Sequence, residues 1–249
     1  MTIRIISRLD VKPPNLVKGI HLEGFRKIGN PADYALNYFE AGADEIMYQD
    51  IVASLYGRNT LTNLINETAK NLFIPLTVGG GIRSLQDAES LIRSGCDKVA
   101  VNSHAIARPK LLSELSQTLG VQAVVLGIEV VKRDGNWSVM THGGREHTGK
   151  VLTEWIKEAE QIGIGEIFLT SIDQDGTFKG FDLHLYDEAR NTTNVSIIAH
   201  GGAGTMQQIL EVCQTGVNAV AIASVLHYKK LNIKTVKEYL FSNGFQTRI

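Results

Sequence analysis

The sequence predicts an α/β protein with the (β/α)8 barrel, or TIM-barrel, fold, formed as one domain over residues 1–249. Three observations support this prediction. Eight short apolar runs alternate with segments of helical period, the length of 249 residues suits such a barrel, and a long internal repeat divides the chain in two. A doubly wound open sheet is the alternative on the alternation alone, but the repeat argues against it.

The apolar runs are nearly continuous in hydrophobic character, which is typical of buried parallel strands. In chain order they are IRIISRLD, EIMYQD, IPLTVGGG, KVAVNS, QAVVLGIEV, EIFLTSID, VSIIAHGG and AVAIAS. Helical segments such as SLQDAESLIRSG, RPKLLSELSQTLG and LTEWIKEAEQIG lie between them. We expect Gly95, Gly120 and Gly163 to end these three helices, because glycine readily adopts the conformation that follows a helix C-terminus.

The composition is that of a globular protein with a substantial core, with 43% hydrophobic and 20% charged residues. A net charge of −1 gives no general attraction to nucleic acid or to an anionic membrane. The N-terminal stretch MTIRIISRLD has no signal-peptide pattern, and no apolar run reaches the ~18 to 20 residues of a membrane span. Cys96 and Cys213 have no metal or redox spacing. We therefore expect a cytoplasmic protein without a metal or other cofactor.

Two long segments of the chain match each other without a gap. Residues 74–103 overlie residues 195–224 at a shift of 121 positions, and their paired glycines coincide. The same shift aligns GADEIMYQDIVAS with GIGEIFLTSIDQD. Because a gapless register over two segments is a strong sign of duplication, the sequence predicts two similar half-barrels, roughly 1–120 and 121–249.

Each predicted half contains a glycine-rich turn directly after a strand, GGGIRS in the first and GGAG in the second. Glycine lets the backbone approach a ligand closely, and a following helix N-terminus favours an anion. In barrels of this class such turns hold phosphate at the carboxyl-terminal rim. Two related turns on opposite sides of one mouth predict an elongated substrate with a phosphate at each end.

Two carboxylates end strands on opposite sides of the predicted barrel. Asp10 ends the first strand and Glu129 the fifth, and Asp50, Asp173 and Asp175 make the rim between them acidic. Carboxylates that face one another across a substrate suit general acid and base catalysis. The alternative is that each is a strand-end acid paired with a nearby lysine or arginine.

The first strand carries an arginine on the same face as its terminal carboxylate. Arg4, Arg8 and Asp10 are separated by even intervals, so they share the inward face if Asp10 does. A buried guanidinium needs a partner, for which Asp10 and Glu129 are the candidates. Alternatively, Arg8 only lowers the pKa of the carboxylate and keeps it ionised.

Several motifs of the chain are far more specific than its fold. They are LDVK, LVKG, GADEI, IPLTVGGGIRS, DKVAVNS, THGGREHTG, GEIFLTSIDQDGT and HGGAG. Over its whole length the sequence resembles the cyclase subunit of imidazole glycerol phosphate synthase. It looks less like the sister isomerase of histidine synthesis, because THGGR and the DVK…VKG pairing are cyclase features.

The resemblance implies a lyase reaction coupled to cyclisation. Ammonia released from glutamine by a partner glutaminase attacks a bis-phosphorylated ribulosyl formimino carboxamide nucleotide. The products are imidazole glycerol phosphate and an aminoimidazole carboxamide ribotide. The resemblance also implies a heterodimer in which the glutaminase docks at the barrel's N-terminal face.

The resemblance assigns roles position by position. Asp10 is implied to be the principal acid and base, and Glu129 stands where the family has its second catalytic aspartate. The residues implied to bind substrate or its phosphates are Lys18, Asp50, Gly81, Asn102, Ser103, Thr170, Asp175, Gly176, Gly202 and Ser224. The charged residues implied to pass ammonia into the barrel are Arg4, Glu45, Lys98 and Glu166.

The sequence departs from the family pattern at four places, three of which surround the implied reaction centre. The family usually has Pro-Cys in place of Ser7-Arg8, a short glycine turn in place of Pro13-Pro14-Asn15, Asp in place of Glu129, and Ser in place of His200. These departures leave an alternative open. A diverged relative would dock a glutaminase and conduct ammonia to another acceptor, such as an enzyme that amidates a nucleotide sugar for surface polysaccharide.

Overall fold

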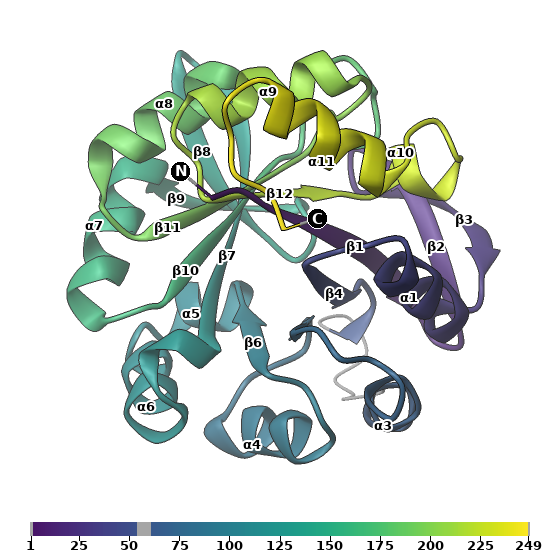
Figure 1. Ribbon diagram of the computed structural model, residues 1–249. Coiled ribbons are helices and arrows are strands. Elements are labelled where there is room, and N and C mark those ends of the chain that lie inside the picture. Colours follow the sequence, from purple (N-terminus) through teal and green to yellow (C-terminus); the bar gives the residue numbers. More distant parts are fainter. Residues whose placement is uncertain (1, 54–60, 249) are drawn as a thin grey trace.

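The computed structural model describes residues 2–53 and 61–248, and it confirms the predicted fold class (Figure 1). Eight parallel strands pair in a closed circuit, since the first is bonded to both the second and the last. In circuit order they are β1 (Arg4–Lys12), β4 (Glu45–Asp50), β5 (Leu76–Gly79), β6 (Lys98–Val101), β7 (Val124–Arg133), β10 (Glu166–Ser171), β11 (Ser196–His200) and β12 (Ala219–Ile222).

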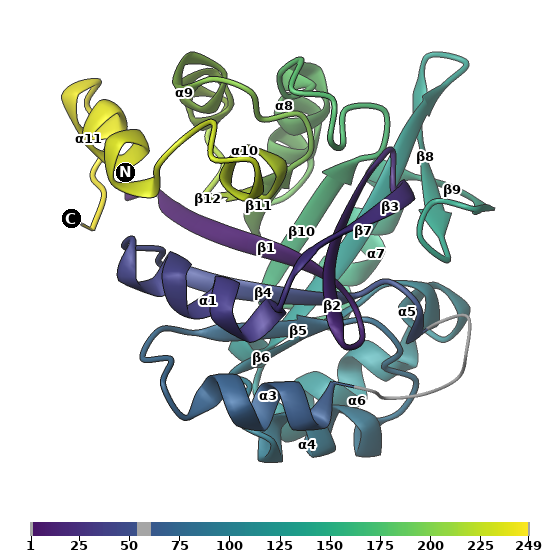
Figure 2. The same ribbon diagram turned by 90° about the vertical axis from the view of Figure 1, so that its right-hand side faces the viewer.

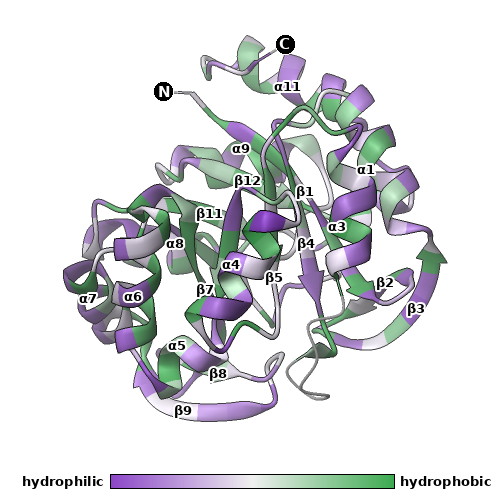
Figure 3. Ribbon diagram, turned by 90° about the horizontal axis from the view of Figure 1, so that it is seen from below, coloured by the Kyte–Doolittle hydropathy of each residue, from purple (hydrophilic) through white to green (hydrophobic). Residues whose placement is uncertain are grey.

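Helices surround the strands, and their polar residues lie mostly on the outside (Figures 1 and 3). The longer ones are α1 (Pro31–Glu40), α3 (Thr62–Ala69), α4 (Leu85–Arg93), α6 (Lys110–Leu119), α7 (Leu152–Ile162), α8 (Leu183–Thr192), α9 (Met206–Gln214) and α11 (Ile233–Ser242). Two short helices, α5 (Ser103–Ala107) and α10 (Ser224–His227), follow β6 and β12. The predicted glycine ends are confirmed, with Gly120 and Gly163 directly after α6 and α7 and Gly95 two residues beyond α4.

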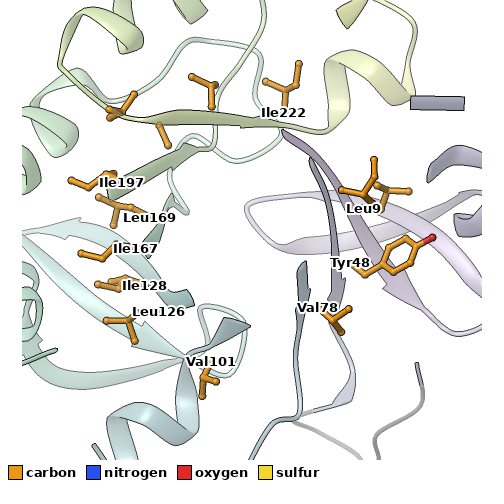
Figure 4. Close-up of a cluster of buried hydrophobic side chains, with 14 of the residues drawn as sticks. Leu9, Tyr48, Val78, Val101, Leu126, Ile128, Ile167, Leu169, Ile197 and Ile222 are labelled. Atoms are coloured by element: carbon orange, nitrogen blue, oxygen red, sulfur yellow. The ribbon is translucent and has the colours of Figure 1, made fainter. Parts of the chain in front are cut away.

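The main core lies between the barrel and the helices. Every second strand residue points outward into it, including Leu9, Leu126, Leu169 and Ile197, all of them fully buried (Figure 4). The other strand residues point into the barrel. There an apolar layer fills the interior and consists of Ile6, Met47, Ala100, Val125, Phe168, Ile198, Ala219 and Ala221. The side chains of β1 that point into the barrel are therefore the ones that the sequence predicts.

Two antiparallel hairpins extend the barrel sheet. β2 (Asn15–Ile20) and β3 (Glu23–Gly29) continue from β1, and β8 (Asn136–Thr141) and β9 (Glu146–Val151) continue from β7. Figure 2 shows both hairpins at the end of the molecule opposite the chain termini. The eight apolar runs do not include these hairpins, because most residues of β3 and β9 are exposed or half-buried and lack the apolar pattern of a buried strand.

Local contacts recur at the predicted repeat distance. Helix α4 begins with a capping box between Ser84 and Asp87, and α9 begins with one between Thr205 and Gln208, 121 residues later. The hairpin extensions also occur at equivalent places, after the first strand of each predicted half. These features support the half-barrel interpretation, which stays a prediction. One residue of the matched segments, Ser54, lies outside the described residues.

Among residues 2–53 and 61–248, no helix is both long enough and apolar enough to cross a membrane.

Candidate active site

Two cavities lie at the carboxyl-terminal ends of the barrel strands. The first has an empty volume of about 880 Å³, and the predicted site residues along it are Asp50, Gly81, Asn102, Ser103, Glu129 and Thr170. The second has an empty volume of about 240 Å³ and is lined by the predicted residues Asp175, Gly176, Gly202 and Ser224, together with His200. The structure thus places the two glycine-rich turns in separate cavities.

The backbone of these turns accepts only glycine at one corresponding position in each half. Gly80 and Gly201, 121 residues apart, have φ values of +100° and +105°. A Cβ atom on Gly80 would lie 2.3 Å from the carbonyl oxygen of Asp50, and one on Gly201 would lie 2.6 Å from that of Ser171. Each turn therefore packs against the end of the preceding strand, which leaves its next residues facing a cavity.

A buried network of charged side chains connects β1 with the first hairpin and the loop after β10. Arg8 Nε donates to Asp10 Oδ1 at 2.9 Å, and Lys18 Nζ donates to Asp10 Oδ2 at 2.9 Å. Lys18 also binds both oxygens of Asp175, at 3.0 and 2.9 Å. Asp10 is therefore a strand-end acid paired with both cations, and Arg8 has the partner that its burial requires.

The Arg8 guanidinium lies between the first cavity and a residue that lines the second. It lines the first cavity and lies over the Phe168 ring, 5.5 Å from its centroid. Its Nη1 lies 3.1 Å from His200 Nδ1 and 3.4 Å from Thr170 Oγ1, and His200 lines the second cavity. Because arginine only donates, Nδ1 of His200 is the acceptor and the proton of the neutral ring is on Nε2.

The network lowers the pKa values of both Asp10 and His200. Burial alone raises the pKa of Asp10, but Arg8 and Lys18 lower it more, so the pKa lies well below its ordinary value. Burial lowers the pKa of His200 well below its ordinary value, and Arg8 and Lys18 act in the same direction. At neutral pH, Asp10 is therefore ionised and His200 is uncharged.

Glu129 is in a different environment, although the repeat places it opposite Asp10. It lines the first cavity beside Thr170, its partner in the pairing of β7 with β10. Its Oε2 is buried and has no hydrogen-bond partner within the described part of the chain. Burial raises the pKa of Glu129 to about 7, because Arg8 offsets only part of the desolvation of the carboxylate.

The four predicted gate residues meet at the amino-terminal end of the barrel. Arg4 donates to Glu45 at 3.1 Å and is also paired with Glu166. Lys98 bridges the same two carboxylates, at 3.0 and 2.7 Å. Two cations and two anions thus alternate around the interior just below the apolar layer.

Not every predicted site residue reaches a cavity. Asp10 and Lys18 are 0% and 2% exposed, and neither of them lines the first or the second cavity. Conversely, His104, His142 and Arg145 line the first cavity, and none of them is among the predicted site residues. The THGGR motif was the signal for Arg145, since it places a cation in the same loop as His142.

The second hairpin contributes directly to the first cavity. The backbone N–H of His142, in the turn between β8 and β9, donates to Ser103 Oγ at 3.0 Å. This bond connects the hairpin to the segment after β6 that was predicted to bind phosphate. In the described residues, no group of three histidine, cysteine or acidic side chains is arranged to hold a metal ion.

Comparisons with known proteins agree with this architecture. A family model described as "Histidine biosynthesis protein" matches residues 4–232. The chain is 53% identical over 207 residues to imidazole glycerol phosphate synthase subunit HisF of Legionella pneumophila, an alignment covering 83% of this chain and 98% of that protein. It is 44% identical over 252 residues to the subunit HisF of Mycobacteroides abscessus, covering 98% of both proteins. It is 43% identical over 252 residues to that of Prochlorococcus marinus, covering 100% of this chain and 98% of the relative. The chain therefore belongs to the histidine biosynthesis protein family, as one of the HisF subunits of imidazole glycerol phosphate synthase.

Proposed function

We propose that this chain is the cyclase subunit of imidazole glycerol phosphate synthase. It uses ammonia from a partner glutaminase to cleave and cyclise the bis-phosphorylated ribulosyl formimino carboxamide nucleotide. The products are imidazole glycerol phosphate and aminoimidazole carboxamide ribotide. The reaction takes place in the cytoplasm, where the free, buried Cys96 and Cys213 stay reduced.

The observation that carries the proposal is the pair of cavities on either side of a charged centre. Each cavity contains a glycine turn and the start of a short helix, so each offers backbone N–H groups to one phosphate. Arg8 and Thr170 on one side contact His200 on the other. A substrate with a phosphate in each cavity therefore lies with its central atoms over this contact.

In this arrangement the predicted binding residues divide between the two phosphates. Gly81, Asn102 and Ser103 hold one of them, with Asp50 beside them at the end of β4. The residues that hold the other are Asp175, Gly176, Gly202 and Ser224. Asp10 and Glu129 supply the carboxylates for the acid and base steps. Lys18, in β2 of the first hairpin, contacts the substrate.

The glutaminase docks at the amino-terminal face, where the ring of Arg4, Glu45, Lys98 and Glu166 passes ammonia into the barrel. This face also exposes apolar surface suited to a protein partner. Phe73, in the loop before β5, is 81% exposed and lines a surface hollow of about 660 Å³ together with Leu72 and Pro75. An exposed aromatic side chain beside a hollow is a common anchor of protein interfaces.

The purified chain alone tests the reaction. It is mixed with the bis-phosphorylated substrate and an ammonium salt at high pH, without a glutaminase, and imidazole glycerol phosphate is measured. Turnover that is lost in both Asp10→Asn and Glu129→Gln is the expected result. Tight substrate binding without turnover in the unaltered protein would refute the cyclase assignment.

One observation favours a second candidate function. Asp10 is held by both Arg8 and Lys18 and reaches neither cavity, whereas a cyclase needs its acid and base at the substrate. In this alternative the chain docks a glutaminase and conducts ammonia to an enzyme that amidates a nucleotide sugar. It is favoured if the assay above gives no product but the partner glutaminase is bound and activated.

A further inference from the structure

Two of the positions at which the chain departs from its family pattern contact each other in the structure. The family usually has Cys in place of Arg8 and Ser in place of His200, and here Arg8 Nη1 lies 3.1 Å from His200 Nδ1. Resting on the proposed function, we infer that His200 binds the phosphate in the second cavity through its Nε2–H. In the same inference, Arg8 is a positioning residue that holds the His200 imidazole in the tautomer able to donate to that phosphate.

The first step of the argument is the place of His200 at the second cavity. It is the last residue of β11, directly before the glycine turn, and it lines the cavity together with Gly202 and Ser224. Its side chain points into the barrel, because Ile198, two residues earlier on the strand, belongs to the inner apolar layer. A phosphate held by the turn and the start of α10 therefore lies beside the His200 ring.

The second step is the fixed orientation of this residue. The His200 ring lies 5.4 Å from the Phe168 ring, measured between centroids. The backbone N–H of His200 donates to the Tyr186 hydroxyl at 3.2 Å, and that hydroxyl donates to the His200 carbonyl oxygen at 2.7 Å. Because His200 is only 2% exposed and is held at both its ring and its backbone, its two ring nitrogens face different surroundings.

The third step is the tautomer. The neighbours of His200 Nδ1 are Arg8 Nη1 at 3.1 Å and Thr170 Oγ1 at 3.3 Å. A guanidinium donates and cannot accept, so Nδ1 is the acceptor and Nε2 carries the proton of the neutral ring. Burial and the charges of Arg8 and Lys18 keep the pKa of His200 well below its ordinary value, so the free protein adds no second proton to the ring at neutral pH.

The fourth step is the open side of Nε2. This nitrogen lies 3.7 Å from Asp175 Oδ1, which is too long for a hydrogen bond, and that oxygen already accepts from Lys18 at 3.0 Å. Asp175 lines the second cavity and not the first, so Nε2 is directed toward the second cavity. A phosphate oxygen there completes the hydrogen bond that the carboxylate does not make.

The charges along the two cavities explain why the second one needs this donor. Among the described residues that line the second cavity, Asp175 and His200 alone have ionisable side chains. The first cavity is lined by four side chains with nitrogen donors, namely Arg8, His104, His142 and Arg145. A carboxylate repels a phosphate dianion, whereas an N–H group placed between the two binds the phosphate, and hydrogen bonds to charged groups are the stronger ones.

Binding of inorganic phosphate tests the role of Nε2 without turnover. The titration is followed on the backbone amide signal of Gly202, which lies at the second cavity. Glutamine and asparagine form a matched pair, because the glutamine amide nitrogen is as many bonds from Cα as Nε2, and the asparagine amide atoms are as many as Nδ1. We expect His200→Gln to keep the affinity within about 3-fold and His200→Asn to weaken it by about 10- to 100-fold.

The control is His184→Asn on the exposed side of α8, which is expected to leave the affinity unchanged. Equal weakening by His200→Gln and His200→Asn would show that only the packing of the ring matters, and this result overturns the inference. An unchanged affinity in both variants overturns it as well.

Nitrogen-15 spectra of the histidine rings test the tautomer and the role of Arg8. Because the chain has seven histidines, the His200 signals are assigned by their absence from His200→Asn. We expect the Nε2–H tautomer in the unaltered protein and a shift of the Nε2 signal when phosphate is added. Arg8→Met removes the donor to Nδ1, so we expect the Nδ1–H tautomer to appear and phosphate affinity to fall by about 10-fold, and Arg8→Lys to restore both.

An Nδ1–H tautomer of His200 in the unaltered protein overturns the inference. An unchanged tautomer in Arg8→Met overturns the positioning role of Arg8, since a merely structural role would not act on the proton of the ring. If Arg8→Met does not fold, the spectrum of the unaltered protein and the two His200 variants decide.

The bis-phosphorylated substrate separates this inference from the proposed function. With substrate and an ammonium salt, His200→Asn is expected to raise KM by a larger factor than it lowers kcat. If the unaltered protein makes no product but its His200 signal responds to phosphate, the proposed function fails and the phosphate contact stands. If product forms while the His200 signal responds to neither phosphate nor substrate, the inference fails and the proposed function stands.

Discussion

Replacing Glu129 by glutamine is expected to change how the stability of the protein depends on pH. The folded protein holds the proton of Glu129 up to a pKa of about 7, whereas an ordinary glutamate loses it near 4.5. Between these values the folded state binds one more proton than the unfolded state, so this group makes the protein less stable as pH rises. The effect is complete above the folded pKa and absent below the unfolded one.

The size of this effect follows from the same two values. Each unit of pKa difference corresponds to about 1.4 kcal/mol, so the carboxylate destabilises the fold at pH 8 by on the order of 3 kcal/mol. Glutamine has nearly the same shape and no charge. We therefore expect Glu129→Gln to match the unaltered protein at pH 4.5 and to exceed its free energy of unfolding at pH 8 by on the order of 3 kcal/mol.

The assay is urea unfolding followed by circular dichroism at pH 4.5, 6 and 8. The matched control is Glu188→Gln on the exposed side of α8, which removes the same charge without changing a buried site. Its difference from the unaltered protein is expected to stay within about 0.5 kcal/mol at every pH. A Glu129→Gln difference that is constant with pH, or that grows toward acid, would refute the reasoning about its buried carboxylate.

Three further predictions concern the turn, the partner face and the core. Gly201→Ala puts a Cβ atom 2.6 Å from a backbone oxygen at a φ of +105°, so we expect calorimetry to show no phosphate binding and the free energy of unfolding to fall by at least about 2 kcal/mol. The control Gly24→Ala, with a φ of +62° and open space around the new Cβ, is expected to lower it by only about 1 kcal/mol. Phe73→Ser is expected to weaken glutaminase binding by at least 10-fold in a titration, whereas the control Tyr228→Ser, beyond the end of β12 at the opposite face, is expected to change the affinity by less than 2-fold. Equal weakening by both substitutions would contradict docking at the amino-terminal face. Leu126→Ala is expected to lower the free energy of unfolding, measured in urea, by about 2–5 kcal/mol, because it leaves a void in the fully buried core between the barrel and the helices. A loss below about 1 kcal/mol would mean that this core repacks around the void.

Most of the barrel followed from local pattern. Continuous apolar runs such as EIFLTSID predicted β10, because a strand buried on both faces needs apolar residues at every position. The even spacing of Arg4, Arg8 and Asp10 predicted their common inward face, since alternation along a strand depends only on the backbone. The two hairpins were missed because their stability comes from pairing with β1 and β7, which leaves no apolar period in their own residues.

The sequence predicted which residues belong to the candidate site, but not which of them contact one another and which face a cavity. The glycine turns and the repeat by themselves predicted two phosphate sites facing each other, and the strand-end positions of Asp10 and Glu129 predicted the two carboxylates. Only the tertiary structure placed Lys18 and Arg8 on the two oxygens of Asp10 and left Glu129 open to the cavity. Spacing along a chain determines which face a side chain takes, whereas its charge and proton depend on the groups that folding brings around it from distant strands.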